Sequence, residues 1–267
     1  MMNRRLFFTR IFWFVSTFAL ALVFSLSSSF ISAAQQPVTL TVSSGAGLRN
    51  VMEAVQQTYT QITPNVTINY NFAASGVLRR QIEQGSPVDI ALLASQEDMD
   101  GLQSQNLLLE GTRRNLLKSE VALIVPQNFT GISSFQDLTS QNIKRIAIGE
   151  PRSVPLGQYA EEVFKYFGIG DRVQSKLVYA RSALEIMSYV ESGNVDAGIV
   201  HDTNAKQSDR VRIVAIAPAA SHKPVIYPIA ILRNSRNTSA ARAFIHFLSS
   251  DRAKAIFQQY GYGIPQN

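Results

Sequence analysis

A strand, a Ser/Gly loop and a helix follow one another between Val38 and Asn50, and this unit constrains the fold more than any other segment. Apolar residues alternate from Val38 to Val42, as in a half-buried strand, and recur at helical spacing from Leu48 onward. The loop Ser43–Gly47 therefore turns the chain at the start of a helix. Unpaired backbone N–H groups and the positive end of the helix dipole make such a loop suited to anions.

The same alternation continues along the chain. Hydrophobic periodicity and turn residues predict further strands at 66–70, 88–94, 121–125, 145–148, 177–179, 197–200, 213–216 and 227–232. They predict helices at 77–85, 96–103, 135–138, 159–167, 182–191, 239–248 and 251–260. Strands that alternate with helices of this length indicate an α/β protein with mostly parallel sheets and helices on both faces.

Two long apolar strands divide this pattern into two halves. We expect residues 121–125 and 227–232 to cross between two mixed sheets, with 35–125 and 226–267 forming lobe 1 and 126–225 forming an inserted lobe 2. Two lobes on two connections can close around a ligand, and open α/β sheets bind ligands beyond the carboxyl ends of their strands. The cleft between the lobes is therefore the expected binding site.

The first 34 residues have the pattern of a secretory signal peptide. Three arginines precede position 11, residues 11–31 carry no charge, and Ser32-Ala33-Ala34 suits cleavage before Gln35. We expect an exported, periplasmic protein. The apolar stretch is also long enough to stay in place as a membrane anchor, which would make the chain a membrane-anchored interaction module.

Composition excludes several classes of function. The chain has no cysteine, so it has no disulfide, no thiolate metal site and no lipid-modified cysteine. The net charge is +6, and without the three leader arginines it falls to +3, with 22 basic against 19 acidic residues. The remaining basic residues do not cluster in a run. We therefore expect no nucleic-acid partner.

Several short motifs occur in a fixed order: Ser43-Ser-Gly-Ala-Gly-Leu-Arg-Asn50, Asn71-Phe-Ala-Ala-Ser-Gly76, Gly85-Ser-Pro-Val-Asp-Ile90, Gly149-Glu-Pro-Arg-Ser-Val-Pro-Leu-Gly157, Gly198-Ile-Val-His201 and Phe257-Gln-Gln-Tyr-Gly-Tyr262. In order and spacing they resemble the periplasmic molybdate-binding proteins of ABC importers, over nearly all of the chain after the leader. The resemblance implies a type II periplasmic-binding-protein fold. It also implies a monomer that binds molybdate or tungstate, delivers it to an inner-membrane permease, catalyses no reaction and needs no cofactor.

The resemblance also implies which residues bind the ligand. The family's first-loop serine or threonine falls on Gly47, its second-loop serine on Ser75, its backbone donors on Leu156 and Ala183, and its tyrosine on His201. Two positions depart from the pattern, because Gly47 has no hydroxyl and His201 is not a tyrosine. The hydroxyl of Ser43 or Ser44 could replace the first. An imidazole nitrogen could replace the second, more strongly when protonated.

A set of uncharged hydrogen-bond donors suits a dianion, whose oxygens all accept hydrogen bonds. The same set selects against an anion that carries a proton, because that proton needs an acceptor. No metal ligands are expected at such a site. Two alternatives stay open: a receptor for sulfate or a small organic carboxylate, and a secreted serine hydrolase using Ser75, His201 and Asp202. Against the hydrolase, the chain lacks a Gly-x-Ser-x-Gly elbow. In addition, His201 and Asp202 are neighbours whose side chains should diverge.

Overall fold

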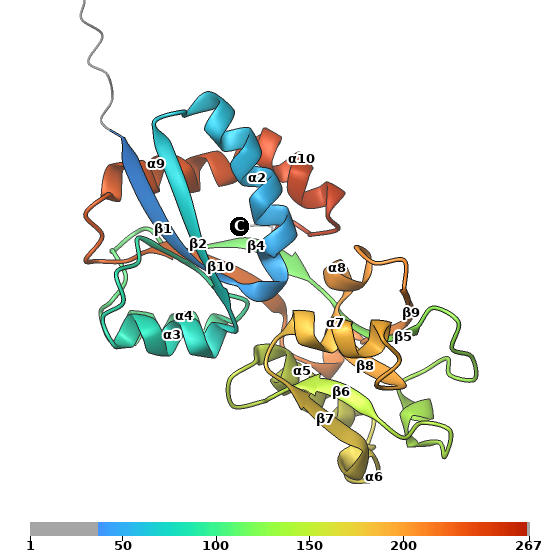
Figure 1. Cartoon of the computed structure of the whole chain (residues 1–267). Coiled ribbons are helices and arrows are strands. Elements are labelled where there is room, and N and C mark those ends of the chain that lie inside the picture. The colour runs from blue at the N-terminus through green and yellow to red at the C-terminus, as the bar shows by residue number, and fades with distance from the viewer. Residues whose placement is uncertain (1–36, 266–267) are drawn as a thin grey trace, which may run out of the picture. The chain divides into compact units, whose positions relative to one another are not determined.

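The computed structural model describes residues 37–265, which form one compact unit from Val38 onward (Figure 1). The predicted signal peptide, 1–34, lies outside the described residues. Within the described part, no helix has the length and apolar character needed to cross a membrane.

Two sheets of five strands each form the framework. The strands are β1 (Val38–Gly45), β2 (Val66–Ala73), β3 (Ile90–Leu92), β4 (Arg114–Ser119), β5 (Val121–Pro126), β6 (Ile146–Gly149), β7 (Leu177–Ala180), β8 (Ala197–His201), β9 (Val211–Ile216) and β10 (Val225–Ile231). The helices are α2 (Arg49–Ile62), α3 (Ser75–Glu83), α4 (Gln96–Ser104), α5 (Pro155–Tyr166), α6 (Gly170–Val173), α7 (Ala183–Glu191), α8 (Asp202–Ala205), α9 (Thr238–Leu248) and α10 (Asp251–Gln259). Short 3-10 turns lie at Ala46–Leu48 (η2), Gln136–Thr139 (η3), Gln174–Lys176 (η4) and Ala219–Ser221 (η5).

The first sheet has the strand order β2-β1-β3-β10-β4. Its first three strands are parallel, with Val42 opposite both Tyr70 and Ile90, and β10 runs antiparallel to β3 and β4. Because β1, β2 and β3 run in the same direction, the loops that follow them leave the same edge of the sheet. This edge carries η2 and the start of α3.

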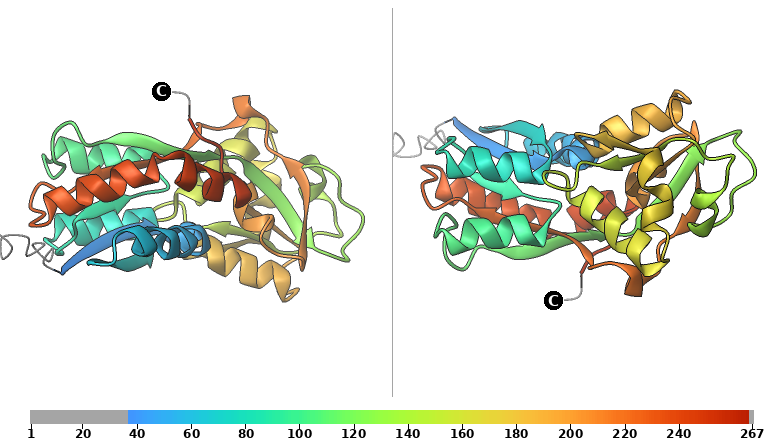
Figure 2. Two further views of the ribbon diagram at one scale, coloured as in Figure 1. Left: turned by 90° about the horizontal axis from the view of Figure 1, so that it is seen from above. Right: turned by 90° about the horizontal axis from the view of Figure 1, so that it is seen from below.

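Helices cover both faces of the first sheet. α2, α9 and α10 lie on one face, with Tyr59 of α2 packed edge-on against Phe244 of α9 at 4.9 Å between ring centroids. α3 and α4 lie on the other, where Leu78 and Met99 are fully buried in a separate apolar cluster. Figure 2 shows α2 and α9 in front when the molecule is seen from above, and α3 and α4 in front when it is seen from below. Burial on both faces explains why the strands of this sheet are rich in apolar residues.

The second sheet has the order β7-β6-β8-β5-β9. β6, β7 and β8 are parallel, whereas β5 runs antiparallel to both β8 and β9. α5 and α7 pack against it, with Val163 and Ile186 fully buried. The fold is therefore a two-lobed α/β structure with two mixed, mostly parallel sheets, as predicted.

The chain passes between the sheets at a different place from the one predicted. β5 pairs with β8 and β9, so residues 121–125 belong to the second sheet, and their assignment to lobe 1 was wrong. Only Glu120 separates β4 from β5. Sequence patterns do not predict β4, so they assign the crossing to the next apolar run, residues 121–125. β4 is an edge strand whose two buried residues, Leu116 and Leu117, are adjacent and give no alternation.

Candidate functional site

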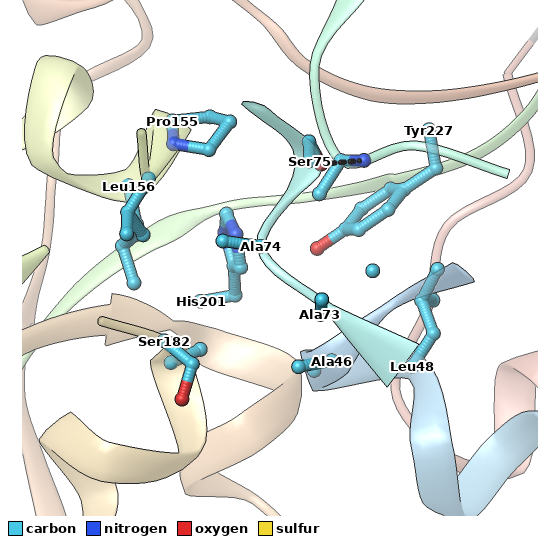
Figure 3. Close-up of a pocket in the computed structure, with 15 residues that line it drawn as sticks. Ala46, Leu48, Ala73, Ala74, Ser75, Pro155, Leu156, Ser182, His201 and Tyr227 are labelled. Carbon is cyan, nitrogen blue, oxygen red and sulfur yellow. Dashed lines mark hydrogen bonds between the residues drawn. The ribbon is translucent and has the colours of Figure 1, made fainter. Parts of the chain in front are cut away.

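One small cavity lies where helix starts from both lobes converge (Figure 3). Its volume is about 30 Å³. Its lining residues are Gly45, Ala46, Gly47, Leu48, Ala73, Ala74, Ser75, Ala94, Val154, Pro155, Leu156, Ser182, Ala183, His201 and Tyr227. A single water needs on the order of 10–15 Å³ on this measure, so the cavity holds a very small solute and excludes sugar-sized ligands.

Backbone N–H groups from several helix starts line this cavity. Ser75 begins α3, Pro155 and Leu156 begin α5, and Ala183 begins α7. The first N–H groups of a helix have no partner within it. In the described structure, Ala74 and Val154, which precede α3 and α5, make no side-chain cap hydrogen bond. These donors, together with the positive ends of the helix dipoles, favour an anion in the cavity.

Two glycines bring the start of α5 up to the end of β6. A Cβ on Gly157 would lie 2.1 Å from the carbonyl oxygen of Gly149, so no larger residue fits at position 157 without moving the helix. A Cβ on Gly149 would in turn lie 2.6 Å from a methyl carbon of Val154. The motif Gly149–Gly157 therefore has a packing function: it places the first turn of α5, with Leu156, at the cavity.

Ser75 directs a hydroxyl toward the cavity. Its Oγ accepts a hydrogen bond of 2.8 Å from the N–H of Ala94, and the side chain is 1% exposed (Figure 3). Because the oxygen already serves as an acceptor for a backbone donor, the hydroxyl proton is free to be donated. Ser75 is thus oriented as a donor.

The cavity carries no formal charge at neutral pH. Among the described residues that line it, none is Lys, Arg, Asp or Glu. Burial lowers the pKa of His201 to about 4, with Asp202 opposing and His222 adding to the shift. Burial also raises the pKa of Tyr227 well above its usual value of 10. Both side chains are therefore neutral in the ligand-free protein at neutral pH, so the cavity that the anion enters holds His201 as a neutral imidazole.

All five residues that the resemblance implied lie on this one cavity: Gly47, Ser75, Leu156, Ala183 and His201. Ser43 and Ser44 do not line it. Both are fully buried within β1, and each hydroxyl lacks a hydrogen-bond partner in the described structure. The cavity lining begins at the next residue, Gly45.

The side chains considered for a serine hydrolase do not form a triad. The carboxylate of Asp202 accepts hydrogen bonds from the Glu120 N–H, at 3.0 Å, and from Lys206. The Nδ1 atom of His201 is buried and has no partner among the described residues. A catalytic histidine needs a group that orients it, and that hydrogen bond is missing here.

Tyr227 and Ser182 also line the cavity, and sequence reasoning did not identify either one. The hydroxyls of Tyr227 and Ser119 are 2.8 Å apart, and the Tyr227 ring lies edge-on to His201 at 5.7 Å. Tyr227 reaches the cavity only because β10 returns to the first sheet, which no local pattern shows. Ser182 has a local signature, since it is the first residue of the predicted helix 182–191 and in the structure caps α7 by accepting a hydrogen bond from the Glu185 N–H at 3.2 Å.

Metal binding has no support in the described part of the chain, because no group of three or more His, Asp or Glu side chains is placed to hold an ion. The site is an array of neutral donors.

Comparison with known proteins places the chain in a family. Residues 40–263 match the model of the bacterial extracellular solute-binding proteins. The putative ABC transporter substrate-binding lipoprotein YvgL of Bacillus subtilis is 35% identical over 85% of this chain and 87% of its own length. The molybdate-binding protein ModA of Haemophilus influenzae is 32% identical over 90% of this chain and 94% of its own length.

Solved structures agree with the fold. The substrate-binding domain of a putative molybdenum ABC transporter from Clostridium difficile is 35% identical and superimposes with a TM-score of 0.70, over 86% of this chain and all of that one. The periplasmic molybdate-binding protein of Azotobacter vinelandii has a TM-score of 0.77 over 85% of this chain and all of its own, at 23% identity. At that identity the second match shows the fold alone.

Proposed function

The chain belongs to the family of bacterial extracellular solute-binding proteins, and we propose that it is the substrate-binding component of an ABC importer for molybdate or tungstate. The observation that carries this proposal is the cavity itself. Five residues predicted as oxyanion ligands, from both lobes and five separate segments of the chain, line one uncharged space of about 30 Å³. Relatives that are 32% identical are named molybdate-binding proteins.

The donor set explains how a neutral cavity holds a dianion. Backbone N–H groups at helix starts, the Ser75 hydroxyl and the His201 ring are fixed within their own lobes before the ligand arrives, and lobe closure brings the two sets together. Each charge-assisted hydrogen bond contributes roughly 1.5–3 kcal/mol, so about five of them reach micromolar affinity or better after the cost of association. No counter-ion is needed, because the donors replace the hydration of the anion.

The ligand also stabilises contact between the lobes. Gly47 and Ser75 belong to the lobe of the first sheet, whereas Leu156, Ala183 and His201 belong to the other. An anion that accepts hydrogen bonds from both sets binds the closed arrangement more tightly than the open one. The free energy of binding therefore also drives closure of the lobes. The receptor thereby offers the permease a distinct, loaded shape. The anion is cargo, and the protein catalyses no reaction on it.

Isothermal titration calorimetry with molybdate, tungstate, sulfate and hydrogen phosphate tests the proposal. We expect molybdate and tungstate to bind at micromolar concentration or below, and hydrogen phosphate to bind far more weakly because its proton meets no acceptor. Tighter binding of sulfate than of molybdate would identify a sulfate receptor instead. The absence of measurable binding heat with all four anions would refute the oxyanion assignment.

Export and assembly complete the proposal. We propose that residues 1–34 are cleaved during export, that the mature protein is a periplasmic monomer, and that it docks on an inner-membrane permease driven by a cytoplasmic ATPase. N-terminal sequencing of the protein from a periplasmic extract should begin at Gln35. An intact leader found on protein in the membrane fraction would instead indicate an anchored receptor.

A further inference from the structure

The short helix α8 of the second lobe contacts the anion-binding loop of the first. α8 follows directly after His201, and its residue Asn204 is 7% exposed. The Nδ2 atom of Asn204 donates a hydrogen bond of 3.0 Å to the carbonyl oxygen of Gly47. A second contact joins the same two regions, because Asn50 donates to the side chain of Gln207 at 2.8 Å.

A side chain at position 47 would press against Asn204. A Cβ on Gly47 would lie 3.1 Å from both Nδ2 and Oδ1 of Asn204, which is closer than ordinary packing. This geometry explains a departure noted in the sequence, where glycine stands in place of the family's hydroxyl residue. The space next to the loop is filled from the opposite lobe.

A second donor to the same carbonyl comes from within the first lobe. The hydroxyl of Tyr262 donates to the Gly47 oxygen at 3.2 Å. Tyr262 follows α10, and its neighbour Gly263 bridges to Lys118 of β4, so it belongs to the same lobe as Gly47. The Gly47 carbonyl is therefore held by one bond within its lobe and by one bond across the lobes.

We propose that Asn204 is a positioning residue that fastens the two lobes over the occupied cavity and slows the release of the anion. The proposal rests on the function proposed above. Asn204 does not line the cavity, so its effect runs through the Gly47 peptide and not through contact with the ligand. A bond that exists only when the lobes meet stabilises the closed state selectively.

The first test measures lobe closure in Asn204→Ala. The chain has no native cysteine, so Gln57→Cys on α2 and Lys165→Cys on α5, both exposed, provide a spin-label pair with one label on each lobe. Pulsed electron resonance then gives the fraction of closed molecules with and without molybdate. We expect Asn204→Ala to lower the closed-to-open ratio roughly three- to tenfold, the effect of one hydrogen bond. Molybdate release measured by stopped flow should accelerate by the same factor.

Tyr70→Phe is the matched control, because it removes a tyrosine hydrogen bond to a backbone carbonyl, that of Met52, entirely within the first lobe. We expect it to leave the closed fraction unchanged. Asn204→Ala should also leave the melting temperature of the ligand-free protein unchanged, which separates closure from a general loss of stability.

An unchanged closed fraction in Asn204→Ala, or an equal loss in Tyr70→Phe, would overturn the inference. The distance distribution of the ligand-free protein tests Asn204 even if molybdate itself does not bind. The experiment thus distinguishes an error in the proposed ligand from an error in the proposed role of Asn204.

Discussion

The backbones of Gly76 and Ser153 nearly touch across the two lobes: a Cβ on Gly76 would lie 3.0 Å from the carbonyl oxygen of Ser153. Gly76 is the second residue of α3, and Ser153 lies in the loop before α5. The approach needs glycine for its small size, since alanine would force the lobes apart.

Gly76→Ala should therefore weaken ligand binding without lowering the stability of the ligand-free protein. We expect molybdate affinity to fall about tenfold or more, because closure must displace the Ser153 backbone, while alanine strengthens the helix by up to about 1 kcal/mol. Calorimetry and urea unfolding of the ligand-free protein measure the two effects. Gly170→Ala serves as the control, because a Cβ at that position meets nothing within 4 Å. Unchanged affinity in Gly76→Ala would contradict this view of the closed state.

Ser75→Ala should weaken binding by roughly 1–3 kcal/mol if the hydroxyl proton is donated to the anion. The substitution also leaves the Ala94 N–H without its acceptor, so the melting temperature of the free protein must be recorded beside the affinity. Ser188→Ala, at an exposed serine of α7, is a suitable control. Equal affinity for Ser75→Ala and wild type would show that this hydroxyl does not contact the ligand.

Restoring the family's hydroxyl at position 47 should fail in this chain unless Asn204 is also shortened. We expect Gly47→Ser alone to bind molybdate more weakly, because the new side chain meets the Asn204 amide at about 3 Å. Gly47→Ser combined with Asn204→Ala should recover part of the loss. A double-mutant cycle of dissociation constants measures the coupling. Strictly additive effects would argue against contact between the two positions.

Molybdate affinity should be flat between pH 8 and pH 6 if His201 stays neutral in the complex, as it is in the ligand-free protein, where burial lowers its pKa to about 4. Stability should behave differently. The unfolded imidazole binds a proton near pH 6.5 and the folded one resists until about pH 4, so stability is fully present above pH 6.5 and declines as pH falls toward 4.

Urea unfolding of the ligand-free protein at a series of pH values, for wild type and His201→Gln, tests the stability part of this prediction. We expect the decline to be shallower in the variant. A tenfold rise in wild-type affinity on going from pH 8 to pH 6 would show that the imidazole is charged in the complex.

Local patterns predicted most of the fold, and the reasons for the exceptions are physical. Helix α5 begins at Pro155, four residues before the first residue assigned from periodicity, because proline is well tolerated in the first turn. Strand β4 was missed because an edge strand has little need of alternation. Strand pairing alone decides which strands belong to the first sheet and which to the second. Pairing is a long-range property that local patterns do not show.

The site was predictable where it consists of helix starts and unpredictable where it depends on contacts distant in sequence. Ser75 and Leu156 follow strands in recognisable turns. Tyr227 reaches the cavity through the return of β10, and Asn204 reaches the adjoining Gly47 peptide from the opposite lobe. Neither has a local signature, since the hydrogen bond from Asn204 spans 157 residues.

The neutrality of the cavity lining has a consequence for the loaded protein as a whole. If affinity is flat with pH, as predicted above, no lining side chain takes up a proton when the anion enters near neutral pH, and the complex is more negative than the empty protein by the full charge of the ion. Isoelectric focusing or native electrophoresis should resolve the two forms as separate bands. A transporter that encounters both loaded and empty receptors can therefore distinguish them by net charge as well as by shape.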